Sequence, residues 1–213
     1  MRGEAGVKER RPITRDLLLL MLANIDKTTR LGANLHAAFC LAFAGFLRIG
    51  EFTYSINDRS DPEFAKWFLT RRSVAFYKDY IELSLPASKT DPFRQGVTIL
   101  IASASDDACP VSSLQNLFNR FPAPRHAPLF DAGVGFSRQW VTQMLRDILM
   151  TLGITGNYSG HSFRRGAATS ARDAGLTEDR IMLLGRWRSD SYKLYIETHP
   201  QHILAASRRL QGQ

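Results

Sequence analysis

The hydrophobic residues of the chain follow helical spacing over most of its length. An almost wholly apolar run from Leu17 to Ile25, preceded by Thr14 as an N-cap, predicts a buried helix. A second helix is predicted over 33–46, where many Ala and Phe residues would let other helices approach closely. Three short runs rich in β-branched and aromatic residues instead predict strands, at 73–77, 80–85 and 97–101. The pattern therefore predicts an α+β fold, mainly α, with one small three-stranded antiparallel sheet.

Cap and turn signals divide the rest of the chain. Clusters of Asp, Pro and Gly predict loops over 57–66 and 122–136. Further helices are predicted over 110–121, 138–152, 161–174 and 177–185, from Asp190 onward, and over 200–210. With 213 residues, 44% of them hydrophobic, the chain is expected to form one domain over 1–213. Its ends are a basic tail, 1–13, which is either solvated or an arm on DNA, and a C-terminal helix, 200–213.

Charge narrows the class of partner. The net charge is +8 at pH 7 and the isoelectric point is about 9.9, which favours a polyanion, nucleic acid before an anionic membrane. No apolar run reaches the roughly 18 residues that a membrane span needs, and the start is no signal peptide. Cys40 and Cys109 lack the spacing of a zinc site or a disulfide framework, and Cys40 is expected to be a small core residue. An intracellular protein is expected, without membrane contact.

One stretch, from Gly160 to Thr169, combines several features of a phosphate site. It reads Gly-His-Ser-Phe-Arg-Arg-Gly-Ala-Ala-Thr, and its His161 and Arg164 are three residues apart, so they would share one helix face. The start of a helix attracts anions, and an Arg side chain adds a fork of donors that suits phosphate oxygens. Tyr195 follows 34 residues after His161, behind the sequence Leu-Gly-Arg-Trp.

With these residues the chain resembles the tyrosine recombinase, or phage integrase, family. The family's signature is a distant Arg, a Lys on a hairpin, His-x-x-Arg, a His or Trp, and a nucleophilic Tyr. Arg48, in Leu-Arg-x-x-Glu, matches the distant Arg that grips the scissile phosphate, and Glu51 resembles the buried acid that orients it. Lys89, in the turn between the second and third predicted strands, matches the Lys that protonates the leaving oxygen, with Arg94 as a nearby competitor.

The resemblance implies transesterification at a DNA phosphodiester. Arg48 and Arg164 would stabilise the transition state, and His161 would act as a base or an orienting group. Tyr195 would form a 3′-phosphotyrosyl link, and Lys89 would give the leaving 5′ oxygen its proton. Neither a metal nor another cofactor is implied, and His199 and His202 lack further ligands at metal-site spacing.

Two positions depart from the family pattern. Counting back from Tyr195, the usual His or Trp position falls on Arg186, while Trp187 lies one residue later, so both are candidates. The Arg-Trp pair after Gly is similar to eukaryotic mobile-element recombinases of the crypton and DIRS types, which would place the protein in the nucleus; otherwise the cytoplasm is expected. The resemblance covers about residues 12–210, the catalytic domain alone, so the family's N-terminal DNA clamp is expected to be absent or to lie on a part of the protein outside this sequence.

Three functions remain open at this point. The first is DNA breaking and rejoining, with double-stranded DNA as partner and self-association on it. The second is a domesticated DNA-binding domain that keeps the fold and no longer cuts, and the third is a basic protein-interaction module. Arg165 is either a DNA backbone contact or solvated, and Tyr192 competes with Tyr195 as nucleophile. The C-terminal helix would dock on the catalytic core of its own or a neighbouring protomer.

Overall fold

The computed structural model describes residues 10–86 and 96–187, which form helices around one small sheet. The helices are α1 (Arg15–Leu22), α2 (Arg30–Ala44), α3 (Ile49–Phe52), α4 (Phe64–Trp67), α5 (Pro110–Arg120), α6 (Arg138–Thr151), α7 (Ser162–Asp173) and α8 (Glu178–Gly185). Two 3₁₀ helices, η1 (Ile56–Ser60) and η2 (Arg71–Ser73), and three strands, β1 (Val74–Phe76), β2 (Tyr80–Leu85) and β3 (Val97–Ala102), complete the described elements. The predicted class, α+β and mainly α, is confirmed.

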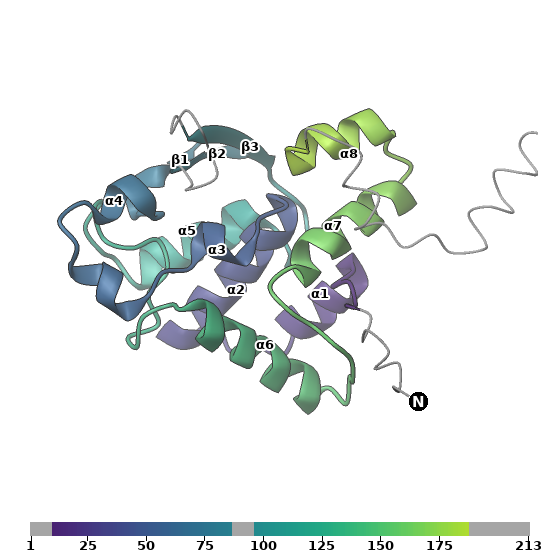
Figure 1. The fold of residues 1–213 in the computed structure, drawn as a ribbon, viewed down its shortest axis with the longest axis horizontal. Coiled ribbons are helices and arrows are strands. Elements are labelled where there is room, and N and C mark those ends of the chain that lie inside the picture. The colour runs from purple at the N-terminus through teal and green to yellow at the C-terminus, as the bar shows by residue number, and fades with distance from the viewer. Residues whose placement is uncertain (1–9, 87–95, 188–213) are drawn as a thin grey trace, which may run out of the picture.

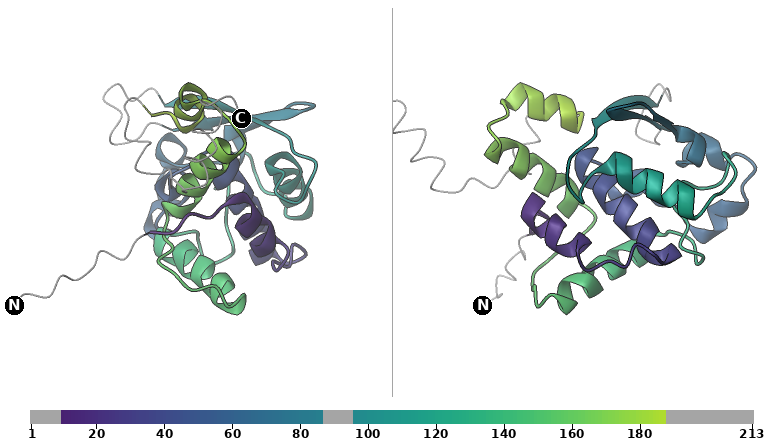
Figure 2. Two further views of the ribbon diagram at one scale, coloured as in Figure 1. Left: turned by 90° about the vertical axis from the view of Figure 1, so that its right-hand side faces the viewer. Right: turned by 180° about the vertical axis from the view of Figure 1, so that it is seen from behind.

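Helix α2 is the centre of the fold. It packs against α5 and α7, and Figures 1 and 2 show the sheet and α8 at one end of the molecule, with α6 at the opposite end. Every residue from Gly32 to Ala42 is buried, because the small Ala side chains let neighbouring helices come close on all sides. The predicted stripe on α6 also faces the core: Val141, Leu145 and Leu149 are buried.

The sheet is antiparallel, in the order β1-β2-β3. Strand β2 pairs with β3 in a register that sets Ile81 opposite Ile101. Ile81, Leu83 and Leu85 alternate with less buried residues, so one face of the sheet covers the core. The strand prediction for 80–85 is therefore confirmed with its bounds, and the neighbouring strands agree within two residues at each end.

The prediction of a structureless loop over 57–66 was wrong. The segment contains η1 and α4, each no longer than five residues. Ser55 and Asp58 form a reciprocal capping box that stabilises η1, and Phe64 brings α4 onto the core with 6% of its surface exposed. Asp and Pro were interpreted as loop signals, although here Asp58 caps a helix.

No helix among the described residues has the length and apolar character needed to cross a membrane.

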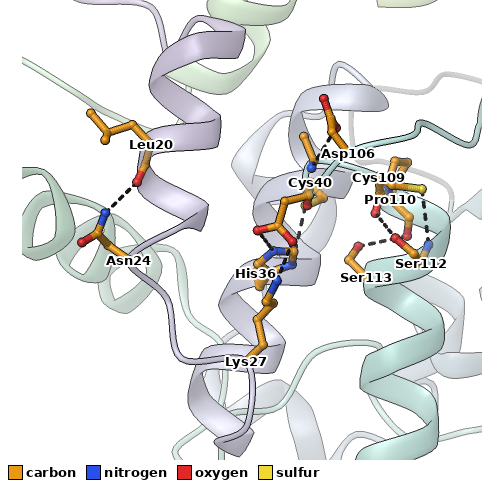
Figure 3. Close-up of polar contacts among 12 residues, drawn as sticks. Leu20, Asn24, Lys27, His36, Cys40, Asp106, Cys109, Pro110, Ser112 and Ser113 are labelled. Atoms are coloured by element: carbon orange, nitrogen blue, oxygen red, sulfur yellow. Dashed lines mark hydrogen bonds and ion pairs between the residues drawn. The ribbon is translucent and has the colours of Figure 1, made fainter.

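A polar cluster joins α2 to the loop before α5. The His36 ring lies 3.2 Å from a carboxylate oxygen of Asp107. Cys40 follows His36 one turn later on α2 (Figure 3). Burial lowers the pKa of His36 and raises that of the Cys40 thiol to about 12. The Cys109 sulfur accepts the backbone N–H of Ser112 at 3.4 Å and caps α5. The expectation that Cys40 is a small core residue agrees with its burial.

Candidate active site

Arg48 stands at the start of α3, immediately after a turn that follows α2. Its backbone N–H donates to Glu51 Oε2 at 2.7 Å, and its Nη1 lies 3.3 Å from Glu51 Oε1. About half of the Arg48 side chain is exposed, against 21% for Glu51. The acid therefore fixes one side of the guanidinium, and the other donors point where a ligand could reach them.

The same carboxylate binds a second arginine from the far end of the described chain. Arg186 Nη2 lies 3.1 and 3.3 Å from the two oxygens of Glu51, and Arg186 Nη1 donates to the carbonyl of Gly45 at 2.9 Å. Of the two candidates for the His or Trp position, Arg186 reaches the Arg48–Glu51 pair. The site thus joins residues 135 positions apart in the sequence.

An unusual backbone conformation directs Arg186 to this carboxylate. Arg186 caps α8 in the left-handed region, with φ 55° and ψ 41°, a conformation that is uncommon for a residue with a side chain. The next residue, Trp187, donates its backbone N–H to Met182 O at 3.0 Å, which closes the turn. The two side chains then separate: Arg186 contacts Glu51, while Trp187 lies 8% exposed in a small apolar cluster with Phe46 and Ile181.

Arg164 lies beneath this cluster instead of at the surface. Its side chain is completely buried, Nη1 donates to Phe46 O at 2.6 Å, and Nη2 donates to Gly185 O. Its guanidinium also stacks over the Trp187 ring at 4.1 Å from the centroid. The Arg164 guanidinium, which was predicted to bind a phosphate, therefore points into the protein here. Arg164 holds the backbone two residues before Arg48 and one residue before Arg186.

His161 is the N-cap of α7, immediately before the first helical turn in which it was predicted. Its side chain makes no capping hydrogen bond. A Cβ at Gly160 would come within 2.2 Å of Ile49 Cγ2, so the chain before His161 lies directly on α3. Burial lowers the pKa of His161, and the positive charges of Arg10, Arg48, Arg138 and Arg164 lower it further. The imidazole is therefore neutral at pH 7 and can accept a proton.

Two of these cations, Arg10 and Arg138, were missed by the sequence interpretation. Arg10 was seen only as part of a basic tail, and Arg138 only as the first residue after a helix cap. Arg165, one turn beyond His161, donates to the backbone carbonyl of Arg10 at 2.7 Å, so it holds this segment in place. A local motif search cannot find such residues, because they meet only in the folded chain.

Three predicted site residues, Lys89, Arg94 and Tyr195, lie outside the described residues, as do Tyr192, most of the basic tail and the C-terminal helix. Their roles stay predictions. Within the described ranges, 10–86 and 96–187, no group of three or more His, Cys, Asp or Glu side chains could hold a metal ion.

Comparisons with known proteins give matches in structure only. No protein-family model and no curated protein matches the sequence. Among solved structures, XerH site-specific recombinase in a post-cleavage complex with palindromic difH substrate matches with a TM-score of 0.67 and 12% identity, over 97% of this chain and 55% of XerH. XerA recombinase matches with a TM-score of 0.66 and 14% identity, over 96% of this chain and 65% of XerA.

A third match is the Tn1549 transposon integrase in complex with circular intermediate DNA. Its TM-score is 0.63 at 13% identity, over 97% of this chain and 67% of the integrase. The chain thus spans between about half and two thirds of the length of these structures. At such low identity the likeness is one of fold, and the elements that carry Arg48, His161, Arg164 and Arg186 belong to that fold. The chain has the fold of a tyrosine recombinase catalytic domain.

Proposed function

We propose that this chain breaks and rejoins duplex DNA through a covalent phosphotyrosyl intermediate, as a site-specific recombinase. The observation that supports it most is the carboxylate of Glu51, which holds Arg48 and Arg186 together beside a neutral His161. A half-exposed guanidinium fixed by an acid, next to a proton acceptor, suits phosphate binding combined with proton transfer. The same elements lie in a fold that recombinases share.

The chemistry assigns one task to each group. Arg48 would bind the non-bridging oxygens of the scissile phosphate and stabilise the charge of the transition state. The Tyr195 oxygen would attack phosphorus after losing its proton, with His161 as the acceptor, and the bond from phosphorus to the 5′ oxygen would break. Lys89 would supply the proton that this leaving oxygen takes up. Rejoining is the reverse, with a 5′ hydroxyl attacking the phosphotyrosine.

Arg164 would act first as a support. Its bonds to the carbonyls of Phe46 and Gly185 hold both segments that present the other arginines. Its complete burial means that a direct phosphate contact would require the surrounding segments to move when DNA binds.

The complete burial of Arg164 also favours a second candidate, a DNA-binding domain that keeps the fold and does not cut. Such a protein would use Arg48 and its neighbours for phosphate contact, and Tyr195 would be an ordinary side chain. The two candidates differ in one observable product, the covalent link between protein and DNA.

A trapping experiment separates the candidates. The chain is incubated with nicked duplexes of randomised sequence that carry the label at the 5′ end of the cleaved strand. A nick a few nucleotides beyond the cleavage site makes the 3′-side fragment short, so this fragment diffuses away with its 5′ hydroxyl and the strand cannot rejoin. Denaturing gels should then show labelled DNA that migrates with the protein, and sequencing of that DNA would give the preferred site. Binding in a native gel without any denaturation-resistant band would support the non-cleaving candidate.

Replacing Lys89 by Ala should slow cleavage of ordinary DNA by roughly the 10²–10⁴-fold typical of general acid catalysis. A 5′-thio leaving group needs no proton, so that substrate should recover most of the lost rate in the variant. The measurement is the rate of adduct formation on the matched oxygen and sulfur substrates. Equal slowing on both would move the role to another residue, and Arg94→Ala is the comparison to make.

A further inference from the structure

Exposed arginines from three distant parts of the chain are close enough for their charges to lower the pKa of His161, and only one of the three belongs to the recombinase signature. Arg48 begins α3, Arg138 begins α6, and Arg10 precedes α1. All three are exposed, and none forms an ion pair with a carboxylate among the described residues apart from Arg48 with Glu51. Arg138 is the member whose position is not explained by the roles given so far.

Arg138 lies directly against the element that carries Arg48. A Cβ at Gly50 would come within 2.9 Å of Arg138 Nη2, so the guanidinium rests on the bare backbone of Gly50. Gly50 stands between Arg48 and Glu51, two residues after the first and one before the second. Any larger residue at position 50 would push the Arg138 guanidinium away from this pair.

The contact between Arg138 and Gly50 depends on the position of α6, which is fixed by its cap and by core packing. Ser137 caps the helix by accepting the backbone N–H of Trp140 at 3.2 Å, and Val141 in the first turns is buried in the core. The backbone around Arg10 is held as well, because the backbone N–H of Arg11 donates to Asn157 O at 3.1 Å and the Arg165 side chain donates to Arg10 O. Rigid backbone therefore supports each cation.

Such a cluster costs free energy in the free protein. Like charges that converge on one spot repel each other, and no described carboxylate other than Glu51 is bonded to them. A duplex supplies a line of phosphates with a charge about every 1.7 Å along its axis, so neighbouring phosphates could meet neighbouring arginines.

We propose that Arg138 binds a backbone phosphate of duplex DNA next to the one that Arg48 holds, and so positions the strand over the site. It is a positioning residue, without a part in the chemical step. The proposal rests on the proposed function in taking DNA as the ligand and Arg48 as a phosphate contact; it does not require cleavage.

The test measures the affinity of the whole chain for a duplex of defined length as a function of salt. Arg138→Gln should lower the slope of log affinity against log salt by about 0.9 and weaken binding roughly three- to tenfold at 0.1 M salt, as expected for one lost phosphate contact. Arg138→Lys, which keeps the charge, should preserve most of the slope. Arg146→Gln is the matched control, because Arg146 is exposed on the same helix, eight residues further along.

Adduct formation gives the second readout. Arg138→Gln should raise the DNA concentration for half-maximal rate and leave the maximal rate within about twofold. An unchanged slope, an equal loss in Arg146→Gln, or a lower unfolding temperature with normal binding per folded molecule would overturn the assignment. The two proposals fail separately: a chain without any adduct that still loses slope in Arg138→Gln would support this one alone.

Discussion

Tyr195→Phe is expected to abolish the covalent protein–DNA adduct completely. The substitution removes a single oxygen and little volume, so folding and DNA binding should persist. The oxygen is the only atom of this side chain that can bond to phosphorus, and Phe offers no replacement. The measurement is the denaturing gel of the trapping experiment, with a native gel on the same samples as the test of binding.

Tyr192→Phe is the matched control for this loss. Tyr192 and Tyr195 are three residues apart, so a helix would bring them to the same face. Spacing from Gly185 selects Tyr195, which lies ten residues later as in the proteins that the sequence resembles, against seven for Tyr192. The control should keep the adduct. An adduct that persists in Tyr195→Phe and vanishes in Tyr192→Phe would reassign the nucleophile.

Arg164→Met is expected to cost about 2–4 kcal/mol in the free energy of unfolding. Met fills most of the volume, but it cannot donate to the buried carbonyls of Phe46 and Gly185, each of which costs about 1–3 kcal/mol when left without a partner. Stacking on Trp187 is lost as well. The segment at Phe46 presents Arg48 to Glu51, and the segment at Gly185 presents Arg186 to it. Because Arg164 holds both segments, adduct formation should fall even in the folded fraction.

Denaturant unfolding followed by far-ultraviolet circular dichroism measures this change. Arg180→Met is the control, since Arg180 is exposed on α8 and its replacement should stay within about 0.5 kcal/mol. If Arg164→Met unfolded like the native chain, the buried guanidinium would not be the support described here.

The sequence was a good guide where the physics is local. The alternation of hydrophobic and polar residues over Tyr80–Leu85 predicted β2 with its bounds, because successive side chains of a half-buried strand point to opposite faces of the sheet. Ser137 and Pro110 predicted the starts of α6 and α5, because a helix start has local residue preferences: a capping hydroxyl before the first turn, or a proline in it. Helices α3 and α4 were missed, because four residues are too few to show a helical period.

Part of the candidate site could also be predicted from the sequence, and part of it could not. Arg48, Glu51, His161 and Arg186 could be named from motif order, and the fold brings Arg48, Glu51 and Arg186 into contact. The inward direction of Arg164 could not be predicted, since Arg side chains are rarely buried completely. Nor could Arg138, whose relation to Arg48 depends on the packing of α6 against a glycine in α3.

The bonds of Arg164 also bear on how the protein forms during synthesis. Its two carbonyl partners lie 118 residues before it and 21 residues after it. A ribosome releases the Arg48 segment long before it releases α8, so the bond from Arg164 to Gly185 can form only after α8 has left the ribosome. Until then Arg186 cannot share the Glu51 carboxylate with Arg48, and the candidate site is incomplete.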